Sequence, residues 1–101
     1  MSPLFSFSDF IDITIRSSRT DRKTKDRLCY GSYHYEGNKT VFELEQTRNW
    51  FKRDSFDLKP GFKVIPENSP YEYVVTGIRY PETRPFKTIL VTERLPRSPS
   101  A

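Results

Sequence analysis

The chain has 101 residues and a mass of 12.0 kDa, which suits one domain and leaves no room for a second hydrophobic core. Its formal net charge is +4, with an isoelectric point near 9.3, so an anionic partner is permitted but not required. A single cysteine and a single histidine exclude an intramolecular disulfide and a zinc site built from several cysteines. We therefore expect no metal and no cofactor.

The composition favours strands over helices. Alanine occurs once, whereas valine, isoleucine and threonine together number 20 and aromatic residues make up 15% of the chain. No apolar run approaches the roughly 18 residues that cross a bilayer, so we expect no membrane partner. Residues 1–7 lack the basic and apolar regions of a secretory signal, which favours a protein kept in a reducing cytosol.

The first predicted element follows a short N-terminal arm of residues 1–9. In residues 10–15, Ile11, Ile13 and Ile15 alternate with Asp12 and Thr14, as a half-buried strand requires. This alternation opens a single predicted domain that spans residues 10–95.

Residues 16–27 contain no apolar side chain and predict a long solvated loop. Six basic and two acidic residues give this segment a charge of +4, which equals the charge of the whole chain. The predicted contact residues for DNA or a neighbouring ring are its cations: Arg16, Arg19, Arg22, Lys23, Lys25 and Arg27.

Two further strands are predicted at residues 28–35 and 40–44. Between them, Gly37 and Asn38 tolerate the positive φ angles of a short hairpin loop. Residues 45–55 combine strand-like and helix-like spacing, and we expect an extended or irregular segment with at most one helical turn.

A turn at residues 58–61 contains Pro60, which presets φ, and Gly61, which takes the position that a side chain would hinder. Strands are predicted at 62–65, 71–78 and 86–93, and residues 96–101 form a predicted disordered tail. Six short strands without an amphipathic helix predict an all-β fold, a small antiparallel barrel or sandwich.

The sequence offers few residues in an arrangement that could carry out catalysis. Cys29 and His34 lie five residues apart in one predicted strand, so they face opposite sides and stand roughly 17 Å apart at the strand rise. The carboxylates show no motif spacing, and no phosphate-binding glycine loop occurs. We therefore expect no catalytic residues and no enzyme activity.

Two interpretations of the cations and aromatic residues remain open. Six cations on one loop would follow a phosphate backbone, or they would stay solvated or order in a protein interface. The aromatic residues would stack on bases or form the core: Tyr30, Tyr33, Tyr35, Phe42, Trp50 and Phe51.

The order of these parts resembles the small head–tail connector proteins of tailed bacteriophages, of the head-closure or stopper type. The resemblance covers about residues 10–95 and starts with the Ile11-Asp12-Ile13 strand. It continues with Pro-Gly followed by alternating apolar and basic residues, and with a later tyrosine strand. The residues that fit those positions are Leu58, Pro60, Gly61, Phe62, Lys63, Val64, Tyr73, Val75 and Ile78. The chain differs from similar proteins by having no glycine in its 66–70 turn.

The resemblance implies a structural virion protein, assembled in the host cytoplasm and located at the neck between head and tail. Its copies would form a ring that closes the head below the portal, with portal or adaptor proteins and tail proteins as partners. The basic loop would then face packaged DNA or a neighbouring ring, and Pro60 and Gly61 would hold a strand junction. The alternative function is a stand-alone nucleic-acid-binding β-barrel.

Overall fold

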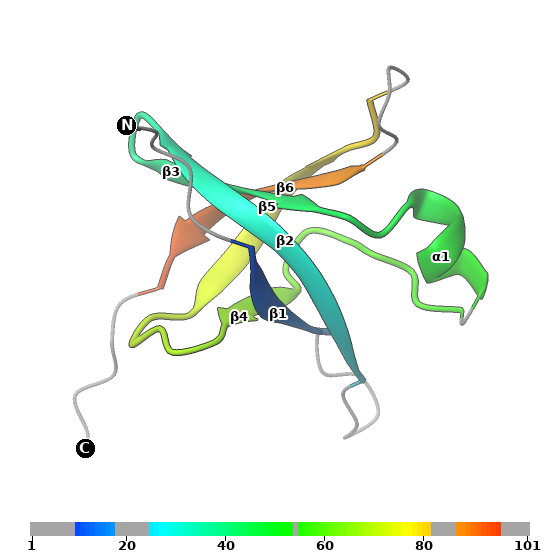
Figure 1. Ribbon diagram of the computed structural model, residues 1–101. Helices are drawn as coiled ribbons and strands as arrows, with labels where there is room; N and C mark the ends of the chain where they lie inside the picture. Colours follow the sequence, from blue (N-terminus) through cyan, green and yellow to red (C-terminus); the bar gives the residue numbers. More distant parts are fainter. Residues whose placement is uncertain (1–9, 18–24, 54, 82–86, 96–101) are drawn as a thin grey trace, which may run out of the picture.

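A computed structural model of the chain describes residues 10–17, 25–53, 55–81 and 87–95 (Figure 1). These residues form six strands and one short helix. In chain order the elements are β1 (Ile11–Arg16), β2 (Asp26–Glu36), β3 (Lys39–Leu44), α1 (Arg48–Arg53), β4 (Lys63–Pro66), β5 (Tyr73–Arg79) and β6 (Thr88–Arg94).

The strands close into an antiparallel barrel in the order β1-β2-β3-β6-β5-β4, which confirms the predicted small all-β fold and shows it to be a barrel, not a sandwich. Closure depends on β1, which pairs with β2 along one edge and with β4 along the other. Thr14, for example, is the register partner of both Leu28 and Ile65. Because β1 is bonded on both sides, the barrel leaves no free strand edge.

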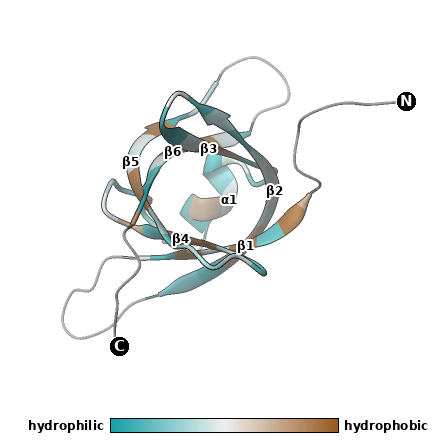
Figure 2. Ribbon diagram, turned by 90° about the vertical axis from the view of Figure 1, so that its left-hand side faces the viewer, coloured by the Kyte–Doolittle hydropathy of each residue, from teal (hydrophilic) through white to brown (hydrophobic). Residues whose placement is uncertain are grey.

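The core fills the barrel with the inward residues that strand alternation supplies. Ile13, Ile15, Leu44, Val64 and Leu90 are fully buried there. The view along the barrel shows the strands as a ring with α1 lying across its far end (Figure 2). The helix thus closes one end of the barrel, which we call the α1 end.

Helix α1 is short but well capped. The backbone N–H of Trp50 donates to the Thr47 hydroxyl at 3.2 Å, an N-terminal cap. At the other end, Phe56 N–H donates to the Phe51 carbonyl and Ser55 N–H to the Lys52 carbonyl, both at 3.0 Å. Ser55 takes the left-handed position of this Schellman motif, with φ of 59°. The predicted irregular segment therefore contains one well-formed helix.

The C-terminal cap leads to a prediction at Ser55. A non-glycine residue in the left-handed region carries a backbone cost that glycine avoids. We expect Ser55→Gly to raise the free energy of unfolding by roughly 0.5–1 kcal/mol. Urea denaturation measures this change, and a lower midpoint than wild type would contradict it.

Two tight turns flank β4, one at each of its ends. In the turn after α1, Gly61 has φ of 100°, and Phe62 N–H donates to the Lys59 carbonyl across Pro60. Gly61 N–H donates to the Val75 carbonyl at 2.8 Å, which ties this turn to β5. Between β4 and β5, Asn68 has φ of 58° and supplies the positive φ without a glycine.

Candidate functional site

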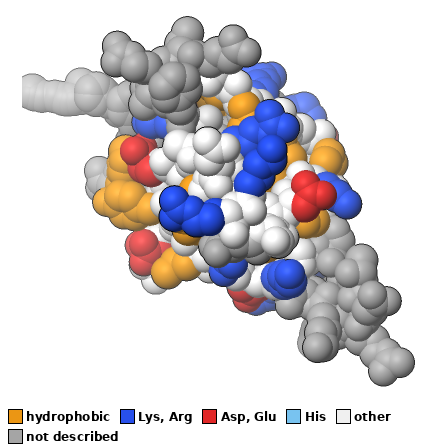
Figure 3. Space-filling model, turned by 90° about the vertical axis from the view of Figure 1, so that its right-hand side faces the viewer, with side chains coloured by type: hydrophobic (Ala, Val, Ile, Leu, Met, Phe, Trp, Pro, Cys, Tyr) orange, Lys and Arg blue, Asp and Glu red, His pale blue; other side chains and the backbone are white. Residues whose placement is uncertain are grey.

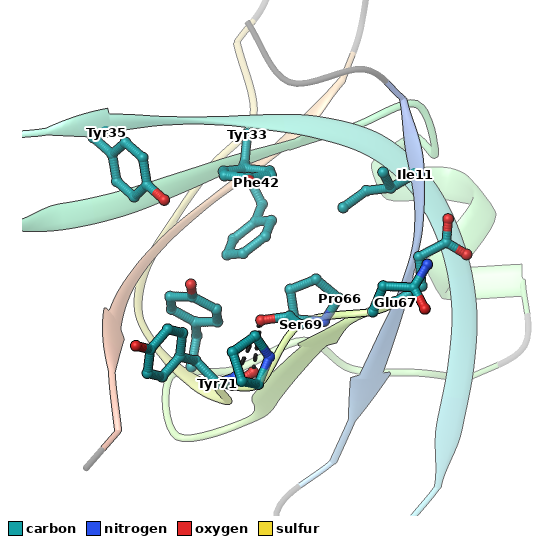
Figure 4. A pocket seen from close by; sticks show the side chains of 11 residues that line it. Ile11, Tyr33, Tyr35, Phe42, Pro66, Glu67, Ser69 and Tyr71 are labelled. Atoms are coloured by element: carbon teal, nitrogen blue, oxygen red, sulfur yellow. Dashed lines mark hydrogen bonds between the residues drawn. The ribbon is translucent and has the colours of Figure 1, made fainter. Parts of the chain in front are cut away.

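The end of the barrel opposite α1 is open and lined by aromatic rings. We call it the mouth. It encloses a cavity of about 450 Å³ whose walls come from β1, β2, β3, β5 and the turn after β4 (Figure 4). The lining residues are Ile11, Tyr33, Tyr35, Phe42, Pro66, Glu67, Asn68, Ser69, Pro70, Tyr71 and Tyr73.

Strand alternation explains why the tyrosines meet in the mouth. On β2, Tyr33 and Tyr35 share the inward face with Gly31 and the buried Cys29, at every second residue. Tyr73 begins β5 facing inward, and Tyr71 stands just before it. Barrel closure then brings the end of β2 and the start of β5 to the same rim.

The aromatic rings of the mouth pack in a chain, edge to face for Phe42–Tyr73 and Tyr33–Tyr35 and tilted for Tyr33–Phe42. Phe42 forms the buried floor, with its ring centroid 5.3 Å from Tyr73 and 5.7 Å from Tyr33. Tyr33 in turn lies 5.8 Å from Tyr35 at an interplanar angle of 81°. Tyr35 is 68% exposed and Tyr71 37% exposed, so these two rings present apolar surface to solvent.

The hydroxyl groups of the inner tyrosines stay protonated well into alkaline solution. Burial raises the pKa of Tyr73, and burial together with the neighbouring Tyr35 raises the pKa of Tyr33. Both groups are therefore neutral hydrogen-bond donors and acceptors near pH 7.

The rim of the mouth carries more negative than positive charge. Among the described residues, four carboxylates stand at strand ends or in the turn on this side, Glu36, Glu67, Glu72 and Glu93, against three cations, Lys39, Arg94 and Lys63, the last of which pairs with Glu72 at 3.6 Å. Lys39 pairs with Glu93 at 2.7 Å. The Arg94 guanidinium lies 4.3 Å from the centroid of Tyr71.

A second hollow continues the mouth along the rim. Its volume is about 480 Å³, and it shares Tyr35 and Tyr73 with the mouth. Thr40, Glu93 and Arg94 line its other side. Together the two hollows form one surface that is lined by tyrosine rings. This surface is long enough for more than one side chain of a ligand.

The α1 end has the opposite charge. Helix α1 carries Arg48, Lys52 and Arg53, and its first turn contains no acidic residue. The view of this end shows Lys and Arg side chains spread over the surface with few carboxylates among them (Figure 3). The barrel therefore has one basic end and one acidic, aromatic end, a separation that composition alone does not reveal.

The predicted basic loop of residues 16–27 needs a correction at both of its ends. Arg16 is the last residue of β1, and Arg27 lies in β2, so the strands extend into the segment. Arg16 and Asp26 pair on the outside, whereas Arg27 lies on the inward side beside the Phe56 ring, so no alternation of apolar and polar residues marks these strand ends. Arg19, Arg22 and Lys23 lie outside the described residues.

Two of the predicted contact cations already have partners in the fold. Arg16 forms a two-point ion pair with Asp26, with nitrogen–oxygen distances of 2.8 and 2.9 Å. This hydrogen-bonded pair lowers the pKa of Asp26 and raises that of Arg16. The Arg27 guanidinium lies 5.8 Å from the Phe56 ring centroid. Lys25 is exposed at the base of the hairpin.

The aromatic residues that could have formed one base-stacking platform separate into three places. Phe42 and Phe51 are buried in the core, and the Trp50 ring packs against Phe51 with centroids 5.0 Å apart. Tyr33 and Tyr35 line the mouth. Tyr30 is 46% exposed on the outside of the barrel.

Tyr30 belongs to an apolar area on the outside of the barrel, over β1, β2 and β4. We call it the outer apolar face and define it as Phe10, Leu28, Tyr30 and Ile65. Leu28 is 64% exposed, and Phe10 packs edge to face on Tyr30 with centroids 5.3 Å apart. Ile65 and Leu28 flank Thr14 in the sheet.

Cys29 and His34 occupy opposite faces of β2, as their spacing predicted. Cys29 is 1% exposed inside the barrel, whereas His34 lies outside with its Nε2 2.8 Å from the Glu36 carboxylate. Within the described part of the chain, no group of three or more His, Cys, Asp or Glu side chains could hold a metal ion. None of the helices described there is long and apolar enough to span a membrane.

Burial of Cys29 predicts a loss of stability in alkali. Desolvation raises the pKa of this thiol from 9.0 to about 12 in the folded chain. Above pH 9 the unfolded chain ionises first, so the free energy of unfolding falls as pH rises from 9 toward 12, by about 1.4 kcal/mol per pH unit. Chemical denaturation at several pH values measures this slope. Cys29→Ala removes this contribution to the slope, and an equal slope in both chains would contradict the prediction.

Comparison with protein-family models, curated proteins and solved structures gives no significant match.

Proposed function

We propose that the chain is a structural protein that forms a ring in the head–tail connector of a tailed bacteriophage. The observation that carries this proposal is the outer apolar face. The described residues include five large hydrophobic side chains that are exposed, and three of them, Phe10, Leu28 and Tyr30, lie together on this face. A contiguous apolar area on an otherwise polar surface is typical of a protein interface.

The barrel itself supports an assembly role. A closed barrel has no free strand edge to extend, so neighbouring copies do not join by adding strand to strand, and an exposed apolar face offers another way to meet. The outer apolar face lies on β1, β2 and β4, and thus on one side of the closed ring of strands. A second copy that covers Leu28 and Tyr30 would remove apolar surface from water. The resemblance to head-closure connectors then supplies the setting in a virion neck.

The charge separation fits a stacked assembly with two different neighbours. In this proposal the basic α1 end, together with the segment after β1, faces packaged DNA or an acidic neighbouring ring. The acidic mouth end faces the next layer. Because Arg16 is neutralised by Asp26, the contact to an anionic partner would depend on Lys25, Arg19, Arg22 and Lys23.

The role of the basic segment leads to a prediction in virions. Replacing Arg19, Arg22 and Lys23 by glutamate reverses the charge that would meet DNA or an acidic ring. We expect the titre of infectious particles to fall by at least roughly ten-fold. Electron microscopy of the particles then shows whether DNA filling or tail joining has failed. Normal numbers of DNA-filled, tail-joined particles would remove this role from the segment.

Electron microscopy also tests the connector proposal itself. The chain is purified together with the portal-side ring protein of the same phage, and negative-stain images are collected. We expect an additional ring layer at the narrow end of the portal assembly. Images that show the portal ring alone, with the chain remaining separate during purification, would contradict the proposal.

A nucleic-acid-binding barrel is the second candidate, and the basic α1 end favours it. In single-strand-binding barrels, cations and stacking aromatic rings lie along the same groove. In this chain the exposed tyrosines of the mouth lie at the acidic end, away from Arg48, Lys52 and Arg53. Oligonucleotide titration tests it, because binding that falls steeply with added salt is expected, and a flat titration at low salt would exclude it.

A further inference from the structure

The mouth has the surface chemistry of a site for an extended, proline-containing peptide. Tyr35 and Tyr71 expose flat rings at its rim, and Pro66 and Pro70 complete an apolar wall. Figure 4 shows the Tyr71 and Tyr35 side chains on opposite sides of the opening. Grooves lined by aromatic rings bind polyproline II segments, because proline rings pack on the ring faces and the segment loses little entropy when it binds.

The charge of the rim selects among possible ligands. Glu67 lines the opening, and Glu72 and Glu93 stand beside it in ion pairs with Lys63 and Lys39. The described rim thus has a small excess of carboxylates, which disfavours a phosphate backbone. A basic side chain within a peptide would instead find a carboxylate partner. The rim therefore favours an extended peptide that carries an arginine or a lysine.

The chain itself contains a segment with this chemistry. Residues 96–99 read Pro-Arg-Ser-Pro, which places a proline at each end and an arginine between them. The segment follows Leu95, whose N–H donates to the Glu72 carbonyl at the rim of the mouth. A residue that precedes proline favours extended backbone, the form that an aromatic groove binds.

We propose that the mouth of one copy binds the Pro96–Pro99 segment of a second copy. The prolines pack on Tyr35 and Tyr71, and Arg97 meets the carboxylates of the rim. This inference goes beyond the connector proposal because it requires only two copies of the chain. It uses a different surface from the outer apolar face.

Paramagnetic broadening between two samples tests the proposal. One sample is the full chain with Ser100→Cys and a nitroxide label, which leaves Cys29 unlabelled because that thiol is 1% exposed. The other sample is ¹⁵N-labelled wild-type chain without a nitroxide. In a mixture of about 1 mM, which detects dissociation constants into the millimolar range, we expect broadening of the Tyr35, Ser69 and Tyr71 amide signals. The Tyr30 signal should stay sharp.

Matched variants separate the mouth from the rest of the surface. Tyr35→Ala in the ¹⁵N-labelled chain should lower the affinity at least about ten-fold, as for a lost aromatic anchor. Tyr30→Ala removes another exposed tyrosine outside the mouth and should leave the broadening unchanged. In the nitroxide chain, two further changes should also weaken the broadening at the mouth. One replaces both Pro96 and Pro99 by alanine, and the other replaces Arg97 by glutamate.

Several outcomes would overturn the proposal. One is a mixture with no broadening in the mouth, and another is equal broadening with Tyr35→Ala and Tyr30→Ala. Broadening that appears only when one chain carries both labels would place the segment in its own mouth. An oligonucleotide that binds the mouth and is weakened by Tyr35→Ala would assign the site to nucleic acid.

Discussion

Gly31→Ala should unfold the barrel or lower its free energy of unfolding by at least about 3 kcal/mol. Gly31 lies in the middle of β2, where its register partners are Ile11 on β1 and Leu44 on β3. A Cβ atom at this position would collide with the Glu43 carbonyl oxygen and would lie 2.9 Å from the Leu44 Cα. Both obstacles are backbone atoms of a paired strand, so no side-chain rotation relieves the clash.

Gly77→Ala is the matched control for this experiment. At Gly77, on β5, the nearest atom to an added Cβ is the Val91 Cβ at 3.7 Å, an ordinary contact. We expect this variant to match wild type or to gain about 0.4–1 kcal/mol from the lower entropy of its unfolded chain. Urea denaturation monitored by circular dichroism compares the two. Similar midpoints for Gly31→Ala and Gly77→Ala would contradict the described pairing of β2 with β3.

Phe42→Ala should cost about 3–5 kcal/mol, the usual range for removing a large aromatic ring from a core. Phe42 is 1% exposed and touches rings on two other strands, Tyr33 on β2 and Tyr73 on β5. Its removal takes away the floor of the mouth and leaves a void between strands that are far apart in sequence. Phe42→Ala therefore lowers the stability of the barrel and also changes the shape of the mouth.

Tyr35→Ala serves as the comparison, because Tyr35 is 68% exposed in the same mouth. Substitutions at exposed positions change stability by about 0.5 kcal/mol or less. Thermal and urea denaturation of both variants check the difference. A cost for Phe42→Ala close to that for Tyr35→Ala would show that Phe42 is not part of the core.

Alternation of side chains was sufficient to predict a small antiparallel all-β fold, although it did not distinguish a barrel from a sandwich. The three isoleucines of β1 and the Pro60-Gly61 turn are local signals, and each depends on only a few neighbouring residues. Polar strand ends have no such signal. Arg16, Asp26 and Arg27 extend the first hairpin beyond the apolar part of the barrel, so their composition resembles that of a loop.

The mouth could not be predicted from the sequence, because it depends on barrel closure. The spacing of Tyr33 and Tyr35 places them on one face of β2, and that much is local. Tyr71, Tyr73 and Pro66 join them only because β4 pairs with β1 and so brings the start of β5 to the same rim. The separation of charge between the two ends also depends on this pairing.

In the proposed connector, the outer apolar face joins copies of the chain into a ring. The most direct test compares Leu28→Asp with wild type in the preparation that contains the portal-side ring protein. Leu28 is 64% exposed, so aspartate there should leave the barrel folded, as circular dichroism can verify. Thr76→Asp is the control, because Thr76 is exposed on β5, across the barrel from β2.

The measurement is the fraction of portal assemblies that carry the additional ring in negative-stain images. We expect wild type and Thr76→Asp to form this ring, and folded Leu28→Asp to remain separate, with at least a ten-fold loss of ring-bearing assemblies, roughly the effect of a charge buried in an apolar contact. A folded Leu28→Asp chain that forms the ring as often as wild type would contradict the claim.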